Sequence, residues 1–431
     1  MTINSRVRET NTSHTQLREP KNTCTGSSSS SSLHSALAIL DPQVRTSNRE
    51  AIQKILRYSG IEVNNLSTFE GNVPVIPLAV SVGRIDVIEL LLRHKADISS
   101  QNSEGLTALH IASMSKADDM VEFLLQHGAD PQIADNDGHT PLWYGACGKC
   151  SDRSFQNLLR AHNRVGIDEP HGVSDVKMPT PLWAAAAGGY VDRAANLLDQ
   201  GAAVDIRDKS GRTLLHRTEW PKSASLTGIL LEHGANPWAR DSQEQKLPLH
   251  RAAEQGRRDI AVKLLDKMIE RQMCSRAEAA NAQDKQGFTP LICAALSGFL
   301  PLVVHLFRVW DADITLRDIH GNDAFYWACA KGHNTVAVYL LGLGASISRG
   351  NKEGNTPLHI AAAHGHEETV RLLLSLCADT KARSRTIRGT WILHGRKESH
   401  GLPQSVTPSE AAKLAGHENI AELIDSFQQD D

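Results

Sequence analysis

A motif that returns about every 33 residues is the feature that most constrains what this chain can fold into. In its clearest copy the motif reads Thr356-Pro-Leu-His-Ile-Ala-Ala-Ala-His-Gly365. Glycine stands nine residues after the start in seven of ten copies, and a leucine pair recurs in the second half of most copies. The copies start at residues 74, 107, 140, 180, 213, 247, 289, 323, 356 and 407. A unit this short cannot bury its apolar face alone, so stacked units must share one continuous core.

Each part of the motif predicts a local structure. A Thr followed by Pro, as at Thr356, caps the amino terminus of a helix, because Pro needs no N–H at the first helical position. The Leu-Ala-Ala stripe that follows is apolar and small, which lets helices approach closely. Gly365 suits a tight turn, and the leucine pair places apolar residues on one face of a second helix. A polar Asp-x-x-Gly stretch, such as Asp318 to Gly321, then predicts a hairpin to the next unit.

On these residues the chain resembles the ankyrin repeat family over about residues 71–427. The resemblance implies an all-α ankyrin-repeat solenoid of about nine to ten helix-turn-helix repeats with short hairpin loops. It also implies protein partners that bind to the hairpin tips and first helices. Histidines at the fourth motif position are then expected to hydrogen-bond between neighbouring loops, and these are His110, His216, His250 and His359.

The regions outside the regular spacing complete the domain prediction. Residues 1–32 are rich in Ser and Thr and are predicted to form a disordered leader, because few of them could be buried. Residues 33–70 are interpreted as a degenerate amino-terminal capping repeat. Long spacings place insertions at about 166–178, 268–281 and 384–406. Each follows a Leu-Leu helix and precedes the next Thr-Pro position, so all three are expected on the hairpin side of the array.

The insertion at 384–406 is basic. The positive residues in and beside it are Lys381, Arg383, Arg385, Arg388, Arg396 and Lys397, with Trp391 among them. Four interpretations stay open: a nuclear-import signal, a kinase target around Ser384 and Thr386, a contact for an acidic partner, and a solvated loop.

Charge and composition exclude several classes of protein. The chain has 46 Lys and Arg against 49 Asp and Glu, so it lacks the overall positive field of a general nucleic-acid binder. We therefore expect no direct nucleic-acid binding. No run of 18 apolar residues exists and the first thirty residues lack an apolar signal segment, so we expect neither a membrane span nor secretion. Seven scattered cysteines indicate reduced thiols, and we expect a monomer in the cytoplasm, the nucleus or both.

Sites for metal or catalysis have little support in the sequence. Cys147 and Cys150 form one C-x-x-C pair, with His162 and His171 downstream. A structural zinc site needs four converging ligands, and a single pair inside a recognisable repeat is weak evidence. We expect no metal and no cofactor. Walker, Gly-x-Ser-x-Gly and His-Glu-x-x-His motifs are absent from the sequence, so we predict that the chain is not an enzyme.

Three groups of residues are candidates for contact with a protein partner. The non-repeating residues near the hairpins are Asn136, Lys209, Arg240, Lys285, His320 and Lys352. Aromatic residues replace the motif histidine at Trp143, Trp183 and Tyr326, where they either contact a partner or pack against the next repeat. The basic insertion adds Arg383, Arg385, Arg388 and Trp391.

These observations favour a non-enzymatic scaffold or adaptor for protein–protein interaction. A solitary repeat array with a Ser-rich head is similar to ankyrin-type coregulators found beside fungal biosynthetic genes, which makes a transcriptional coregulator of a biosynthetic pathway the first hypothesis. The amino terminus lacks the dense basic helix of a DNA reader, which argues against direct DNA contact. The alternative is a cytoplasmic scaffold or a substrate receptor of a ubiquitin ligase.

Overall fold

The computed structural model describes residues 74–81, 83–162, 167–168, 180–271, 275–384 and 405–427. The expected leader and capping repeat lie outside the described residues, as do most of the first and last insertions. The chain divides into two compact units, Met1–Asp97 and Ile98–Asp431.

One helix pair is described in the first unit. It consists of α3 (Val75–Ser81) and α4 (Ile85–Arg93). Ile76, Ile88 and Leu91 are fully buried, as the leucine pair and the apolar stripe of the motif predict.

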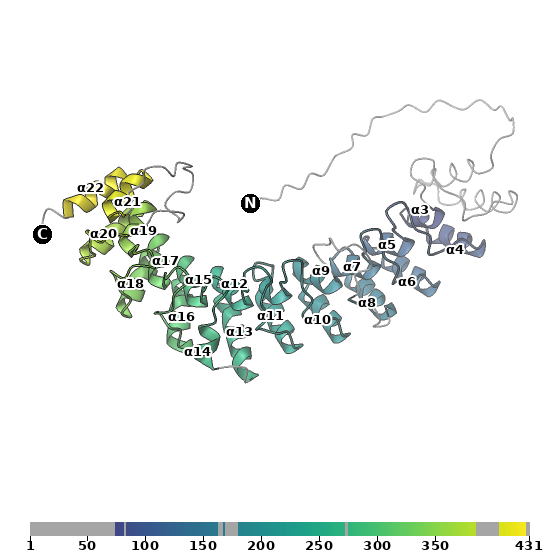
Figure 1. Ribbon diagram of the computed structural model, residues 1–431. Helices are drawn as coiled ribbons and strands as arrows, with labels where there is room; N and C mark the ends of the chain where they lie inside the picture. The colour runs from purple at the N-terminus through teal and green to yellow at the C-terminus, as the bar shows by residue number, and fades with distance from the viewer. Residues whose placement is uncertain are drawn as a thin grey trace, which may run out of the picture. The chain divides into compact units, whose positions relative to one another are not determined.

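The second unit is a series of helix pairs that follow one another along the chain (Figure 1). The first helices contact each other in one layer, as α5 does with α7, and the second helices contact each other in another, as α6 does with α8. The pairs are α5 (Ala108–Ser113) with α6 (Asp118–Gln126), α7 (Pro141–Ala146) with α8 (Asp152–Ala161), α9 (Pro181–Gly188) with α10 (Val191–Asp199), η2 (Leu214–His216) with α11 (Ser223–Glu232), α12 (Pro248–Glu254) with α13 (Arg258–Glu270), α15 (Pro290–Leu296) with α16 (Leu300–Trp310), α17 (Ala324–Ala330) with α18 (Asn334–Gly342), α19 (Pro357–Ala363) with α20 (Glu367–Ser375), and α21 (Pro408–Ala415) with α22 (Glu418–Phe427).

The local signals of the motif produce these helices. Thr289 Oγ1 accepts the backbone N–H of Ile292 at 3.2 Å, and Pro290 occupies the first turn of α15. On the second helices the leucine pair faces inward, so that Leu264 and Leu265 of α13 are fully buried. Caps and apolar stripe therefore act together to start each helix and to orient it.

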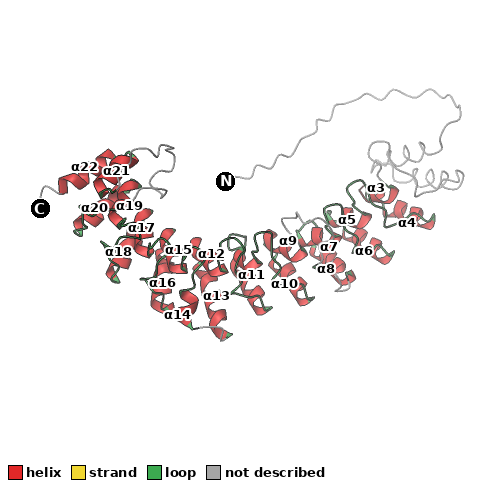
Figure 2. Ribbon diagram, in the orientation of Figure 1, coloured by secondary structure: helices red, strands yellow, loops and turns green. Residues whose placement is uncertain are grey.

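The predicted all-α solenoid is confirmed. Figure 2 shows helices joined by loops, and the described ranges contain no strand; Ser384 and Val406 form an isolated bridge. One first helix is shorter than predicted. The unit that starts at Thr213 has only the 3₁₀ turn η2, and Pro221, five residues further on, disfavours helical backbone at the residue before it.

The insertion at 268–281 is not on the hairpin side, and this expectation was wrong. Its residues lengthen α13 to Glu270 and form an additional helix, α14 (Arg276–Ala280). Helix α14 contacts α13 and α16, which are second-layer helices (Figure 1). The capping box of Ser275 and Glu278 starts this short helix, a signal that the 33-residue frame hides.

The basic insertion leaves the array at a hairpin and returns to the same place. The backbone N–H of Ser384 donates to the carbonyl oxygen of Val406 at 3.0 Å, and both side chains are buried. Buried Ser384 is a poor kinase target, which removes it from that interpretation. The next repeat then begins at Thr407, whose side chain caps α21.

Contacts between consecutive repeats also use the turn between the two helices of each pair. Gly332 has φ of 73°, and a Cβ added there would lie 2.8 Å from Nδ1 of His366 in the next repeat. His366 Nε2 lies 3.0 Å from the carbonyl oxygen of Ala330, at the end of α17. The same arrangement joins His333 to Gly298 and to the carbonyl of Leu296 one repeat earlier. A glycine at this turn therefore provides room for the neighbouring histidine as well as a left-handed backbone.

We predict that Gly332→Ala destabilises the array more than Gly128→Ala. Gly128 also has a positive φ, 84°, but nothing lies within 4 Å of an added Cβ. Both changes introduce left-handed strain of about 1 kcal/mol, and Gly332→Ala additionally displaces His366, for about 1 kcal/mol more. Chemical denaturation measures both values. Equal losses in the two variants would show that the histidine contact contributes nothing.

Candidate protein-binding surface

The hairpins that start at residues 102, 135, 208, 241, 284, 318 and 351 each begin with an aspartate or asparagine. In the hairpin that starts at Asp318, one carboxylate oxygen accepts the backbone N–H of His320 at 2.8 Å and that of Asn322 at 2.9 Å. Asp135, Asp208, Asp284 and Asn351 accept N–H groups two and four residues later in the same way. Two backbone N–H groups of each of these loops are thereby bonded within the hairpin, which helps to fix its shape without a strand.

Neighbouring hairpins are joined through the backbone of their exposed tips. The second residue of one hairpin donates its N–H to a carbonyl of the hairpin before it, at 2.9 to 3.0 Å. The donor–acceptor pairs are Asn136 to Glu104, Ser242 to Ser210, Lys285 to Glu244, Ile319 to Gln286, and Lys352 to His320. We call Asn136, Lys209, Ser242, Lys285, Ile319 and Lys352 the tip row, because each is the second residue of its hairpin. The bonds above fix the backbone of five of these residues. All six residues are exposed, and Asn136 Nδ2 also donates to the carbonyl oxygen of Ser103 at 2.9 Å.

The expected tip residues are exposed. Asn136, Lys209, Lys285, His320 and Lys352 all have exposed side chains. They lie on hairpins of one unit, and the hydrogen bonds above connect several of these hairpins in sequence.

Arg240 has a different environment. Its Nη1 donates to the carbonyl of Gln245 at 2.7 Å and to that of Gln283 at 2.9 Å, so the side chain bridges two consecutive hairpins. Gln101, Arg207 and Gln283 make equivalent pairs of bonds in other repeats. Sequence reasoning missed this bridging position, although its signal is a recurrent Gln or Arg six or seven residues before the motif. A partner contact for Arg240 stays a prediction.

The aromatic replacements of the motif histidine are mostly internal. Trp183 is fully buried and meets Trp220 edge to face, with ring centroids 5.6 Å apart. Tyr326 is buried within α17. Trp143 is half-buried and stacks on His139 at 3.8 Å. The structure thus favours packing for Trp183 and Tyr326. Trp143 is partly exposed and could contact a partner.

Of the basic insertion, only Arg383 is described among the candidate contacts. It is exposed and donates to Ser405 Oγ at 3.2 Å. Arg385, Arg388 and Trp391 lie outside the described residues.

A further set of hydrogen bonds, which the sequence analysis missed, joins the hairpin carboxylates to side chains of the first helices. The remaining oxygen of Asp135 accepts Tyr144 Oη at 2.7 Å, and that of Asp318 accepts Trp327 Nε1 at 3.0 Å. Arg251 makes the same contact with Asp241 at 3.0 Å, and it also contacts Glu244 and Glu254. The donor is always four residues after the motif start, a position whose chemistry changes from repeat to repeat and so gives no repeating signal.

The motif histidines have the geometry that the resemblance implies. His250 Nδ1 accepts the backbone N–H of Leu247 at 3.1 Å, and Nε2 lies 2.9 Å from the carbonyl of Phe288 in the next hairpin. His110, His216 and His359 are placed in the same way between their own helix and the next hairpin. Because a backbone N–H points at Nδ1, the ring is neutral and donates through Nε2. Burial lowers the pKa of all four, and that of His250 to about 4.

Cys147 and Cys150 lie at the turn between α7 and α8. Burial raises the pKa of Cys147 to about 11 and also raises that of Cys150, so both are neutral thiols. The Arg193 guanidinium binds the carbonyl of Cys150 at 3.0 Å and Asp152 at 2.6 Å, which gives this turn a structural role. No group of three or more potential ligands occurs among the described residues, and His171 is outside them.

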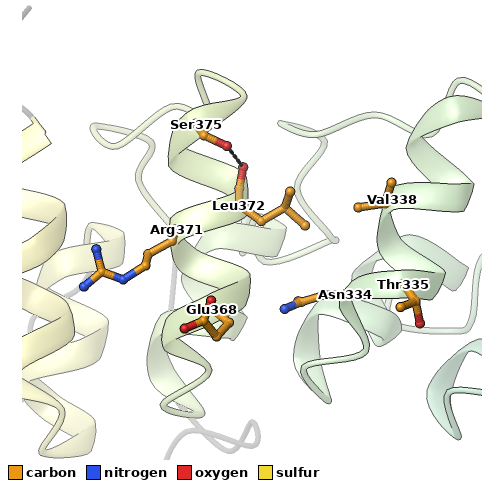
Figure 3. A pocket seen from close by; sticks show the side chains of 7 residues that line it. All are labelled: Asn334, Thr335, Val338, Glu368, Arg371, Leu372 and Ser375. Carbon is orange, nitrogen blue, oxygen red and sulfur yellow. Dashed lines mark hydrogen bonds between the residues drawn. The ribbon is translucent and has the colours of Figure 1, made fainter.

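A broad depression lies between the second-layer helices α18 and α20. Its volume is about 700 Å³, and Val338 and Leu372 face each other across it (Figure 3). Asn334, Thr335, Glu368, Arg371 and Ser375 complete the lining. Val338 is 52% exposed, so this surface is a second place where a partner has access to apolar side chains.

We predict that acidification destabilises the array through the motif histidines. The unfolded chain binds protons at these rings near their ordinary pKa, whereas the folded chain binds them only at lower pH, so stability falls as the pH drops from 7 to 5. For His250 alone the loss is on the order of 2 kcal/mol at pH 5. His250→Gln keeps a neutral donor at every pH and should reduce the pH dependence by this amount. Thermal melts at pH 7 and pH 5 that show the same pH dependence in both proteins would contradict this.

Comparison with known proteins agrees with this architecture. A family model described as "Ankyrin repeats (3 copies)" matches residues 43–135, 76–168, 228–318 and 300–384, and one described as "Ankyrin repeat" matches 180–209. None of the described helices is both long and apolar enough to span a membrane.

Several relatives share part of the chain. Human SH3 and multiple ankyrin repeat domains protein 2 is 28% identical over 66% of this chain and 12% of its own length. Mouse protein fem-1 homolog A-like is 35% identical over 26% of this chain and 14% of its own. Human ankyrin repeat and SOCS box protein 16 is 32% identical over 46% of this chain and 43% of its own. The chain thus spans less than half the length of these relatives, and the family models, which together cover most of it, show that it belongs to the ankyrin repeat family.

Proposed function

We propose that this chain is a non-enzymatic adaptor that binds protein partners along its hairpins. Ankyrin repeats are protein-interaction modules, and the tip row is the observation that supports this use here. Its backbone is fixed by bonds between hairpins, while Asn136, Ile319 and Lys352 are exposed and differ in chemistry. A surface that is rigid before binding loses little conformational entropy when a partner docks.

The finer proposal is regulatory. A transcriptional coregulator that acts through a protein partner, without direct contact to nucleic acid, fits the near-balanced charge of the chain. The basic insertion at 384–406 is then an import signal or a partner contact. We further propose a monomer that is present in the cytoplasm, the nucleus or both.

A substrate receptor of a ubiquitin ligase is the second candidate. What favours it is the relative whose name joins ankyrin repeats to a SOCS box and which is 32% identical over 206 residues. A cytoplasmic scaffold is the related possibility favoured by the relative whose name includes SH3. The two candidates differ in what they hold: a coregulator retains a transcription factor, and a receptor retains ligase subunits.

Cross-linking in native cells followed by purification and mass spectrometry tests the proposal. We expect full-length protein to retain a small set of proteins that a Gln variant at Arg383, Arg385, Arg388, Arg396 and Lys397 retains less well or fails to bring into the nucleus. The melting temperature of that variant should hardly change, because the other junctions between repeats form without such a basic insertion and the exposed charge of Arg383 contributes little to stability. Recovery of ligase subunits would favour the receptor. The absence of any enriched protein across repeated experiments would contradict an adaptor.

A further inference from the structure

Three consecutive hairpins carry a basic, apolar and basic side chain at the same tip position. These residues are Lys285, Ile319 and Lys352, and all three are exposed. Ile319 is 46% exposed although its neighbours in the loop are polar. An isolated apolar residue on a surface needs no explanation, but here it lies between two lysines in a row whose spacing is fixed.

The spacing is fixed because the three tips are bonded in series. Lys285 donates its N–H to Glu244, Ile319 donates to Gln286, and Lys352 donates to His320, at 2.9, 2.9 and 3.0 Å. Gly287 allows the close approach, since a Cβ added there would lie 3.0 Å from Cα of Asp318 in the next hairpin. The three side chains therefore project from one rigid ribbon of loops.

The two lysines keep their charge available. Within the described part of the chain, neither Lys285 nor Lys352 forms an ion pair with a carboxylate. The nearby carboxylates are used elsewhere, since Glu244 pairs with Lys246 and Arg251, and the oxygens of Asp318 accept loop and Trp327 N–H groups. Glu353 accepts Asn355 Nδ2 at 3.3 Å. The positive charge at the tips thus faces solvent.

Two hairpins earlier in the same unit carry an exposed carboxylate at their third residue, whereas the hairpin that starts at Asp208 carries the exposed Lys209. Glu104 and Asp137 are exposed on the hairpins that start at Asn102 and Asp135. A phosphate backbone would be repelled there, whereas a partner of limited length would contact only the basic tips. Exposed Ile319 also has no use in phosphate recognition, but it suits the side chain of a peptide.

We propose that the tips at Lys285, Ile319 and Lys352 bind an extended acidic segment of a protein, with an apolar residue of that segment on Ile319 and carboxylates on the two lysines. This inference rests on the proposed adaptor function and specifies the chemistry of its partner. The charges provide orientation and association rate, and the apolar contact fixes the register of the bound segment.

Fluorescence anisotropy with a labelled synthetic peptide tests the proposal on the full chain. The probe has acidic residues on both sides of one central leucine, and a second probe has serine in place of that leucine. The test variant is Lys285→Glu with Lys352→Glu. The matched control is Lys149→Glu with Lys331→Glu, which changes the net charge equally at exposed lysines in the turns between helices, at the other end of the first helices from the hairpins.

We expect the tip variant to weaken binding at low salt by roughly tenfold or more, and the control by less than about twofold. Ile319→Ser should weaken binding of the leucine probe and leave binding of the serine probe unchanged. Equal loss in both charge variants would reduce the effect to net charge and overturn the proposal. The same holds if neither variant changes binding, or if single-stranded DNA of equal charge binds as tightly with the same dependence on the tips. Should partners from the cross-linking experiment remain bound to the tip variant, the adaptor function would stand and this inference would fail.

Discussion

The hydrogen bonds that join successive hairpins in the described residues are the interactions on which the rest of the second unit depends. A single repeat leaves loop N–H and carbonyl groups without partners, and the neighbouring repeat supplies them through three routes: the tip N–H, the bridging Gln or Arg, and Nε2 of the motif histidine. A net hydrogen bond of this kind contributes about 1 kcal/mol, so the stability of the loops increases with each neighbouring repeat. The leucine pairs add the apolar core, but the loop bonds set how one repeat is aligned with the next.

The same bonds explain why the candidate binding surface lies at the tips. The loop backbone and the inner side chains form bonds between neighbouring repeats. Only the outward side chains can therefore vary without loss of stability. Lys285 and Ile319 occupy one structural position and differ completely in chemistry, whereas Arg240 lies a few residues before its tip and is engaged by two carbonyls. The tip position varies in chemistry and is available to a partner. The position of Arg240 is bonded to neighbouring loops and serves the fold.

Much of the fold could be predicted because the motif residues act locally. Thr289 caps its own helix, Gly332 forms its own turn, and these needs are visible in one copy of the motif. The remaining features of the fold depend on contacts that the 33-residue motif does not reveal. The unit at Thr213 forms only a 3₁₀ turn, a capping box at Ser275 turns a presumed loop into α14, and Trp183 is buried against Trp220. In the candidate site, the exposure of the tips could be predicted from their place in the hairpins. The bridging role of Arg240 could not, because it depends on where the next repeat lies.

Hydrogen exchange at single amides tests the central claim most directly, namely that solvent-exposed tips have a fixed backbone. The account predicts that the N–H groups of Lys285, Ile319 and Lys352 exchange on the order of a hundredfold more slowly than the same residues in an unstructured peptide, although their side chains are exposed. Exchange at the rate of an unstructured peptide would mean that the hairpins are not joined in solution, and it would contradict both the alignment of the repeats and the rigid surface inferred from it.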